Sequence, residues 1–305
     1  MALDNIIRKM IEDASASSRP GFSHGSPQDA RNTLTAGRSV LGRGPEIREV
    51  RDLRIPTRSG NIQARNYVPS AKPLGQLVYF HGGGWVLGGL DDFDHFARAL
   101  AARSNVAVLM VDYRLAPEAP FPNAVEDCID ALSWVFERTT DLSSMAGTLP
   151  VLVGGDSAGG NLAIVANLET NFEVTGQLLL YPVVDCNFET WSYIEYGNGL
   201  PLTKRDMEWF FEHYAPRDQW SDPRISPVHH NNLNRSPRSV VFAAEYDVLR
   251  DDSVNYVKSL EALGVNVVLH EIKGLPHGFV RLFNLVPACD AALDLIAVEL
   301  KKLLD

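Results

Sequence analysis

Short, uninterrupted apolar runs recur along the chain from residue 76 onward, and mixed segments separate them. The runs are QLVYF (76–80), VAVLMVDY (106–113), PVLVGG (150–155), GQLLLYPVV (176–184), SVVFAAEY (239–246) and NVVLHEI (266–272). A strand that is apolar on both sides belongs to a sheet that is covered on both faces. The pattern therefore predicts a set of buried strands.

The segments between these runs carry apolar residues at helical spacing. They are residues 91–104, 122–139, 251–263 and 287–304. Upstream, residues 49–70 alternate apolar and polar positions around Ser59-Gly60-Asn61, which is typical of a β-hairpin. Strands that alternate with helices predict right-handed crossovers and a mostly parallel sheet with helices on both faces.

Two segments fall outside this rhythm. Residues 15–48 are rich in Ser, Gly, Arg and Pro, which indicates a loop with short helical pieces. Residues 187–216 hold no β-like run, so we expect helices inserted after one strand. Their aromatic side chains favour a lid over an apolar pocket, and a plain surface insertion is the alternative. The aromatic residues behind this interpretation are Trp191, Tyr193, Tyr196, Trp209, Phe210, Phe211 and Tyr214.

The charge balance narrows the classes of partner. The chain has 305 residues, with 28 Lys and Arg against 38 Asp and Glu, and a net charge of −10. An acidic protein repels phosphate backbones, so we expect no nucleic-acid partner. A chain of this length buries enough surface to fold without disulfides or a metal ion.

Cysteine usage and the N-terminus bear on the compartment. Cys128, Cys186 and Cys289 are far apart and form no C-x-x-C pair, which predicts reduced thiols in a cytoplasmic protein and no zinc site. Residues 1–14 form an apolar helical stripe with charges inside it, unlike a signal peptide, and no run reaches the ~18 apolar residues of a membrane span. We therefore expect no membrane partner, with a peripheral amphipathic anchor at residues 1–14 as the alternative.

The segment Gly155-Asp156-Ser157-Ala158-Gly159 has the pattern G-x-S-x-G and lies between an apolar run and an apolar helical segment. In that context the pattern marks a nucleophile on a tight strand-to-helix turn. The turn raises the serine oxygen above the carboxyl edge of the sheet, and the following helix presents free N–H groups to a developing anion. Ser157 is therefore the candidate nucleophile; a glycine-rich turn with an incidental serine is the alternative.

A run of three glycines directly follows the first buried run, in His81-Gly82-Gly83-Gly84-Trp85. Consecutive glycines cost conformational entropy, which makes sense where backbone N–H groups must point at a ligand. We expect Gly83 and Gly84 to donate two hydrogen bonds to an oxyanion and Ala158 to donate a third. A flexible turn or a phosphate-binding loop is the alternative, but the spacings G-K-[ST] and G-x-G-x-x-G are absent. His81 precedes the glycines and is interpreted as their brace.

A serine nucleophile needs a base and a group that orients the base. Of the eight histidines, His277 is the best placed, because KGLPHGFV puts it on a loop just past the last apolar run. Asp247 directly follows SVVFAAEY and is the candidate orienting carboxylate. Asp251 and Asp252 begin the next helical segment, where acidic residues complement a helix N-terminus. The order Ser157, Asp247, His277 is the order found in α/β-hydrolases.

With these motifs the chain resembles the hormone-sensitive-lipase group of α/β-hydrolase esterases, bacterial family IV. The matching segments are HGGGWVLGG (81–89), DYRLAPEAPFP (112–122), GDSAGGN (155–161), EYDVLRD (245–251) and HGF (277–279). The resemblance implies an α/β-hydrolase fold with a mostly parallel eight-stranded sheet, helices on both faces and a helical cap. It implies a catalytic triad of Ser157, Asp247 and His277 and an oxyanion hole of Gly83, Gly84 and Ala158.

The resemblance also implies a division of the chain and an activity. The cap would combine residues 1–45 with the insertion 187–216, and the core would comprise residues 46–186 and 217–305. The expected reaction is hydrolysis of short- to medium-chain acyl esters through an acyl-enzyme, with a small-molecule ester as substrate and no cofactor or metal. Hydrolysis of small amides, lactones or carbamates by the same residues and a small-molecule receptor on this fold are the alternatives. A monomer and a homodimer are both open.

The segment DYRLAPEAPFP (112–122) is expected to serve the architecture. Arg114 and Glu118 are placed to form an ion pair, and the prolines fix a turn before the next helix. We also predict a cis X-Pro bond between residues 116 and 122.

Overall fold

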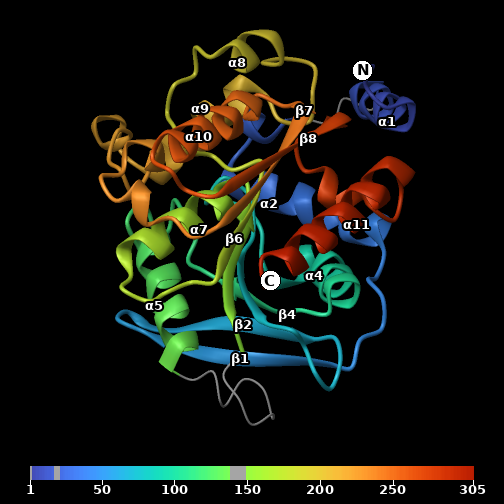
Figure 1. Cartoon of the computed structure of the whole chain (residues 1–305). Coiled ribbons are helices and arrows are strands. Elements are labelled where there is room, and N and C mark those ends of the chain that lie inside the picture. Colours follow the sequence, from blue (N-terminus) through green and yellow to red (C-terminus); the bar gives the residue numbers. More distant parts are fainter. Residues whose placement is uncertain (1, 17–20, 138–148) are drawn as a thin grey trace.

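In the computed structural model, which describes residues 2–16, 21–137 and 149–305, eight strands form one sheet in the order β1-β2-β4-β3-β5-β6-β7-β8 (Figure 1). The strands are β1 (Glu49–Thr57), β2 (Gly60–Val68), β3 (Gln76–Phe80), β4 (Ala107–Asp112), β5 (Val151–Asp156), β6 (Gly176–Leu180), β7 (Ser239–Tyr246) and β8 (Val267–Pro276). The β1–β2 and β2–β4 pairs are antiparallel, and every other neighbouring pair is parallel. The predicted α/β fold with a mostly parallel sheet is therefore confirmed.

The buried strands follow the apolar runs closely. β3 and β7 match QLVYF and SVVFAAEY residue for residue, and every residue of β3 is buried. β6 is shorter than predicted, because it ends at Leu180 instead of continuing to residue 184. Tyr181 has a left-handed φ of 38°, and Pro182 has no N–H to donate to a neighbouring strand, so the ladder stops there.

Two layers of helices cover the sheet. One face carries α5 (Asn123–Glu137), α7 (Ala158–Glu169) and α10 (Arg250–Ala262), and the other carries α4 (Leu90–Ser104) and α11 (Pro287–Lys302) (Figure 1). Of these, α4, α5, α10 and α11 match the four predicted segments to within a few residues, and α7 follows the turn that contains Ser157. The prediction for the helix at 122–139 included residues 138 and 139, which lie outside the described residues. Side chains on both faces of the central strands are buried, which explains their uninterrupted apolar sequence.

The remaining helices of the described residues come from residues 1–48 and from the insertion 187–216. They are α1 (Asn5–Ala16), α2 (Pro27–Ala36) and α3 (Arg38–Leu41) near the N-terminus, and α8 (Trp191–Glu195) and α9 (Lys204–Tyr214) in the insertion. Short 3-10 turns lie at Phe22–His24, Arg217–Gln219, Pro227–His229, Leu233–Arg235 and Phe279–Leu282. Among the described helices, none is long and apolar enough to cross a membrane.

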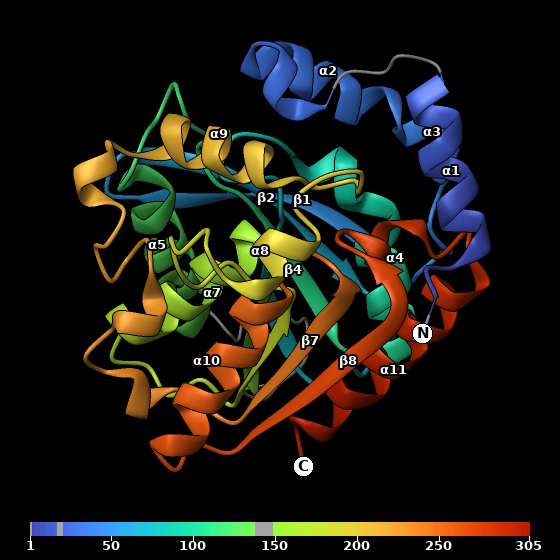
Figure 2. The same ribbon diagram turned by 90° about the horizontal axis from the view of Figure 1, so that it is seen from above.

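The N-terminal helices and α9 lie on the same side of the molecule (Figure 2), and the turn at Phe22–His24 lies against α9. The carboxylate of Asp206 on α9 accepts a hydrogen bond of 2.9 Å from the backbone N–H of Ser23. The rings of Phe22 and Phe210 are 5.9 Å apart. Both helices begin with a capping box, from Ser26 for α2 and from Thr203 for α9, which satisfies backbone donors at their first turns.

The loop between β4 and α5 contains two cis peptide bonds, Ala116-Pro117 and Phe121-Pro122, so the predicted cis X-Pro bond is confirmed. The expected ion pair between Arg114 and Glu118 is wrong. Arg114 instead makes two-pronged hydrogen bonds of 2.8 Å to the buried carboxylate of Asp127 on α5. Glu118 pairs with Arg31 of α2. The sequence spacing of four residues favours a pair only on a helix, and this loop is not helical.

Arg114→Met is expected to destabilise the fold, because it leaves the carboxylate of Asp127 buried without its cation. Breaking a buried pair typically costs 3–5 kcal/mol, and the 31% exposure of the Arg114 side chain reduces our expectation to about 2 kcal/mol. Urea unfolding measures the difference. Arg58→Met is the matched control, because Arg58 binds Asp130 on the same helix but is about half exposed, so less than ~1 kcal/mol is expected. Equal losses in both variants would contradict this assignment.

Candidate active site

Ser157 lies in the tight turn between β5 and α7. Its backbone has φ 56° and ψ −122°, a conformation that residues other than glycine rarely adopt. The neighbouring glycines make this turn sterically feasible. A Cβ on Gly159 would overlap the carbonyl oxygen of Phe80, and a Cβ on Gly155 would overlap the backbone of Gly159. The predicted strand–turn–helix context around Ser157 is therefore present.

Three residues that are far apart in the sequence meet at this turn. The Nε2 atom of His277 lies 3.1 Å from the Oγ atom of Ser157. On the other side of the ring, Nδ1 of His277 lies 2.6 Å from Oδ2 of Asp247. The second carboxylate oxygen of Asp247 accepts a hydrogen bond of 2.9 Å from the N–H of Leu249, and Asp247 is buried. The structure thus brings the three residues that sequence reasoning selected into one hydrogen-bonded chain.

The strands explain this convergence. Ser157 follows β5, Asp247 follows β7 and His277 follows β8, so all three lie at the carboxyl ends of parallel strands. Asp251 and Asp252 are directed elsewhere. Asp252 accepts from the N–H groups that follow β6, and Asp251 accepts from the N–H of Ser192 in α8.

The glycine loop, which we define as residues 81–89, lies beside Ser157 and holds its peptide groups in fixed orientations. The carbonyl of Gly82 accepts a 2.8 Å hydrogen bond from Nδ1 of His81, so that nitrogen carries the ring proton. The carbonyl of Gly83 accepts hydrogen bonds from the N–H groups of Val86 (3.1 Å) and Leu87 (2.8 Å). In a trans peptide the N–H points opposite to the C=O. These bonds therefore fix the directions of the N–H groups of Gly83 and Gly84.

The three predicted oxyanion donors share one property, which is that their N–H groups are not used in the hydrogen bonds of the described fold. Within the described part of the chain, the N–H groups of Gly83, Gly84 and Ala158 have no hydrogen-bond acceptor. Gly83 and Gly84 line the same cavity as Ser157, and Ala158 begins α7. Gly84 and Ala158 are buried and Gly83 is half-buried. Backbone N–H groups in such positions usually have an acceptor, so these three are free to donate to a ligand atom.

Asp156 connects the serine turn to the glycine loop, and the sequence analysis did not single it out. Its Oδ1 atom accepts hydrogen bonds of 2.9 Å from both the hydroxyl of Tyr79 and the N–H of Gly82. Burial raises the pKa of the Asp156 carboxyl above its ordinary value, while the hydrogen bond from Tyr79 lowers it. The available signal was a carboxylate at the end of an apolar strand, a position that requires buried partners.

His81 acts on the glycine loop, as its position in the sequence predicts. Besides the bond to Gly82, its ring stacks between Tyr113 and Phe93, at centroid distances of 4.5 Å and 5.2 Å. The hydroxyl of Tyr113 donates a 2.7 Å hydrogen bond to the carbonyl of His81. The loop is therefore anchored from both sides by buried aromatic groups.

An apolar cavity of about 240 Å³ adjoins Ser157. Its wall comes from the N-terminal segment, the glycine loop, the insertion and the loop of His277. The non-catalytic side chains on this wall include Phe22, Leu34, Leu41, Leu87, Phe93, Leu202, Met207, Phe210 and Leu282. Part of the expectation for the insertion is corrected here, because Phe210 is the one residue among the seven predicted aromatics that lines this cavity.

Two other aromatics of the insertion, Phe211 and Tyr214, join it to the glycine loop. Tyr214 stacks on Trp85 of the glycine loop at 4.3 Å, and Phe211 meets the same ring edge-on at 5.1 Å. Trp191, by contrast, is 53% exposed. Aromatic composition alone does not distinguish rings that face a pocket from rings that fix the segment above it.

Arg281 is a second residue that the sequence analysis missed. It follows His277 by four residues and lines the cavity. Its guanidinium lies 5.0 Å from the centroid of the Phe93 ring, and desolvation lowers its pKa from the ordinary value. No group of three or more His, Cys, Asp or Glu side chains that could hold a metal ion occurs in residues 2–16, 21–137 and 149–305.

The sequence of this chain is similar to the sequences of several known proteins. A family model described as alpha/beta hydrolase fold matches residues 77–281. The carboxylic ester hydrolase LipN of Mycobacterium tuberculosis is 44% identical over 259 residues, which cover 79% of this chain and 67% of the relative. The ethyl acetate hydrolase of Pseudomonas putida is 36% identical over 275 residues, with 86% of each protein covered.

Solved structures of other proteins superpose on nearly the whole of this chain. A thermostable esterase from Pseudomonas putida superposes with a TM-score of 0.93 at 30% identity and covers 100% of this chain and 98% of its own. A hyperthermophilic esterase from the archaeon Pyrobaculum calidifontis has a TM-score of 0.89 at 36% identity, with 99% of each chain covered.

Gly159→Ala tests the steric requirement of the serine turn. The added Cβ would overlap the Phe80 carbonyl, which belongs to a buried strand and cannot move aside, so we expect a loss of about 3 kcal/mol in the free energy of unfolding. Gly264→Ala is the control, because Gly264 has a φ of 75° but open space around it, and only about 1 kcal/mol of strain is expected. Chemical unfolding of both variants measures the difference. A Gly159→Ala protein as stable as the wild type would refute the close approach.

Proposed function

The chain belongs to the α/β-hydrolase fold family, in its hormone-sensitive-lipase group, and from this membership we propose that it hydrolyses carboxylic esters. In this proposal Ser157 is the nucleophile, His277 is the general base and Asp247 orients His277. The observation that carries the proposal is the hydrogen-bonded chain itself, 3.1 Å from Ser157 to His277 and 2.6 Å from His277 to Asp247. The relatives named as ester hydrolases support the reaction class.

In the acylation step, Oγ of Ser157 attacks the acyl carbon and Nε2 of His277 takes the hydroxyl proton. The electron pair of the carbonyl moves to its oxygen. The N–H groups of Gly83, Gly84 and Ala158 donate to this oxyanion. His277 then gives its proton to the leaving alcohol as the tetrahedral intermediate collapses, and the acyl group stays on Ser157.

In the deacylation step, a water molecule takes the place of the alcohol. His277 removes a proton from the water as its oxygen attacks the acyl carbon, and then returns that proton to Ser157. Asp247 accepts the Nδ1–H of His277 throughout, which keeps Nε2 free to act as the base and stabilises the protonated ring. The buried position of Asp247 strengthens this interaction because water does not screen it.

We assign the cap to residues 1–45 and 187–216, and the core to residues 46–186 and 217–305. The support is the cavity wall, to which the two cap segments contribute Phe22, Leu34, Leu41, Met207 and Phe210 above Ser157. A cytoplasmic location also stays part of the proposal, with support from three cysteines that are all free thiols.

The Ser157→Ala variant is expected to lose ester turnover by a factor of ~10⁴ or more, since it removes the nucleophile. Rates with p-nitrophenyl esters measure this loss, and thermal unfolding checks that the variant is folded. A matched panel of amides and lactones assayed beside the esters shows whether the same serine prefers another acyl group. Undiminished turnover by a folded Ser157→Ala protein would rule the proposal out.

A second prediction concerns chain length. At roughly 30 Å³ for a water-sized group, a cavity of about 240 Å³ has room for about eight such groups. We therefore expect kcat/KM to be highest for short- to medium-chain acyl esters and to fall for longer ones. A series of p-nitrophenyl esters, each assayed below its micelle concentration, tests this. Highest activity on emulsions of long-chain lipid would contradict it.

A further inference from the structure

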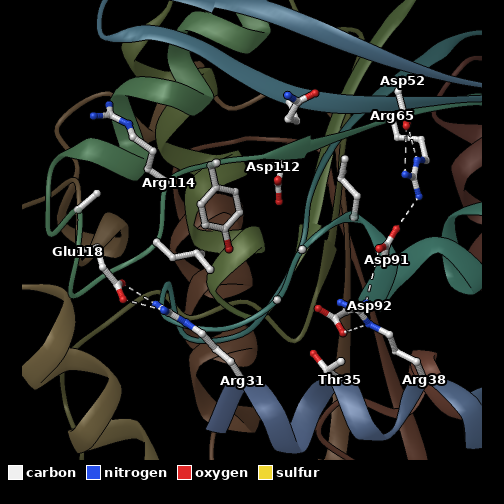
Figure 3. Close-up of a pocket in the computed structure, with 17 residues that line it drawn as sticks. Arg31, Thr35, Arg38, Asp52, Arg65, Asp91, Asp92, Asp112, Arg114 and Glu118 are labelled. Atoms are coloured by element: carbon white, nitrogen blue, oxygen red, sulfur yellow. Dashed lines mark hydrogen bonds and ion pairs between the residues drawn. The ribbon is translucent and has the colours of Figure 1, made fainter. Parts of the chain in front are cut away.

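Arg31 connects the N-terminal helix α2 to the glycine loop. Its Nε donates a 2.9 Å hydrogen bond to the carbonyl of Val86 inside that loop. Its Nη2 donates a 2.9 Å hydrogen bond to the carbonyl of Ala116. Both terminal nitrogens bind the carboxylate of Glu118 at 2.7 Å, and Figure 3 shows this pair. One side chain thus makes four hydrogen bonds, which a guanidinium with five N–H donors can do and an ammonium with three cannot.

The two carbonyl groups that accept from Arg31 belong to residues that are hydrogen-bonded to the segment of the predicted oxyanion donors. Val86, whose carbonyl Arg31 holds, donates its own N–H to the carbonyl of Gly83. Ala116 donates its N–H to the carbonyl of Trp85, the residue between Gly84 and Val86. The carbonyl of Gly83 belongs to the same planar peptide as the N–H of Gly84. A shift of Val86 or Trp85 therefore turns the Gly84 N–H away from its direction.

We propose that Arg31 is a positioning residue, which holds the glycine loop in the geometry that binds the oxyanion and so makes the N-terminal segment part of the catalytic apparatus. This inference rests on the proposed esterase function and adds a residue to it. Arg31 acts through Val86 and Ala116, without a place in the cavity that adjoins Ser157.

A pocket of about 920 Å³ lies behind the glycine loop and provides a comparison within the same segment (Figure 3). Arg31 and Arg38 both reach it from the N-terminal helices. Arg38 binds Asp92 at the start of α4 with a 2.7 Å hydrogen bond from Nε. Both arginines anchor the N-terminal segment to the core, but of the two only Arg31 contacts a carbonyl of the glycine loop. Comparing variants at the two positions therefore distinguishes an effect on anchoring from an effect on the position of the loop.

The ion pair with Glu118 is a secondary part of the contacts that Arg31 makes. The hydrogen bonds from Arg31 lower the pKa of Glu118 to about 2, so this carboxylate stays ionised at neutral pH. The side chain of Glu118 is 64% exposed, however, and a pair with one exposed partner contributes little to stability. The two bonds to backbone carbonyls are therefore the functional part of the arrangement.

The experiment compares Arg31→Met with Arg38→Met. We expect kcat of Arg31→Met to fall roughly 10- to 30-fold with KM nearly unchanged, because a misdirected donor weakens a bond that forms only in the transition state, where full loss of one donor costs ~10²–10³. Arg38→Met is expected to keep kcat within about twofold of the wild type while losing a similar anchor. Thermal unfolding of both variants measures how much stability is lost when each anchoring contact is removed.

A transition-state analogue supplies a readout that a merely structural role would not move. An aryl trifluoromethyl ketone adds to Ser157 through a new bond from Oγ to the ketone carbon, the proton passes to His277, and the ketone oxygen becomes the oxyanion. Its inhibition constant should rise in Arg31→Met by the same factor by which kcat falls. Glu118→Gln keeps both backbone bonds of Arg31 and should retain kcat within about threefold, so it serves if Arg31→Met does not fold.

The outcomes separate the hypotheses. Equal losses of kcat in Arg31→Met and Arg38→Met, a change in KM alone, or an unchanged inhibition constant would overturn the positioning role. With Arg31→Met unfolded, a large fall of kcat in folded Glu118→Gln would overturn it as well. Failure of the proposed function is distinguishable, because it would appear as turnover that survives in Ser157→Ala. Guanidinium ion at millimolar concentration, which can enter the open pocket, should partly restore kcat of Arg31→Ala and leave Arg38→Ala unchanged.

Discussion

The backbone contact between the turn after β5 and the end of β3 is the constraint on which the site depends. Gly155 and Gly159 let this turn lie directly against the carbonyl of Phe80. Phe80 is the last residue of β3, and the glycine loop begins with the next residue. The same contact therefore sets Ser157 in its strained conformation and places the loop beside it. Any side chain at either glycine would separate Ser157 from the N–H groups of Gly83 and Gly84.

Hydrogen bonds from other residues hold this arrangement in place. Asp156 links the serine turn to the N–H of Gly82, and His81 fixes the peptide that carries the N–H of Gly83. Arg31 in α2 binds the same loop at Val86, which is 55 residues away in the sequence. Preorganised donors need no rearrangement as charge develops, and this is the main way in which a protein lowers the barrier to acyl transfer.

Much of the fold was predictable from the sequence, for a physical reason. Strands covered on both faces must be apolar throughout, so β3 and β7 could be located to the residue. The convergence of Ser157, Asp247 and His277 was also predictable, because each follows a strand end in a parallel sheet. The end of β6 was not, because it depends on the conformation of Tyr181.

Side-chain pairing was much harder to predict. The expected partner of Glu118 was four residues away in sequence, and its actual partner, Arg31, is 87 residues away. The only signal for Asp156 was its position, next to Ser157 and at the end of an apolar strand. The aromatics of the insertion suggested a pocket, yet two of them instead join the insertion to the glycine loop. Each of these outcomes depends on which distant surfaces come together, and that information is not local in the sequence.

The central claim is that the hydroxyl of Ser157 becomes reactive because His277 and Asp247 are aligned with it. Mass spectrometry of the protein after complete inhibition by a p-nitrophenyl phosphonate ester tests this most directly. The account predicts one phosphonyl group per chain, on the peptide that contains Ser157. A phosphonyl group on any other residue, or full inhibition without a covalent adduct, would contradict it.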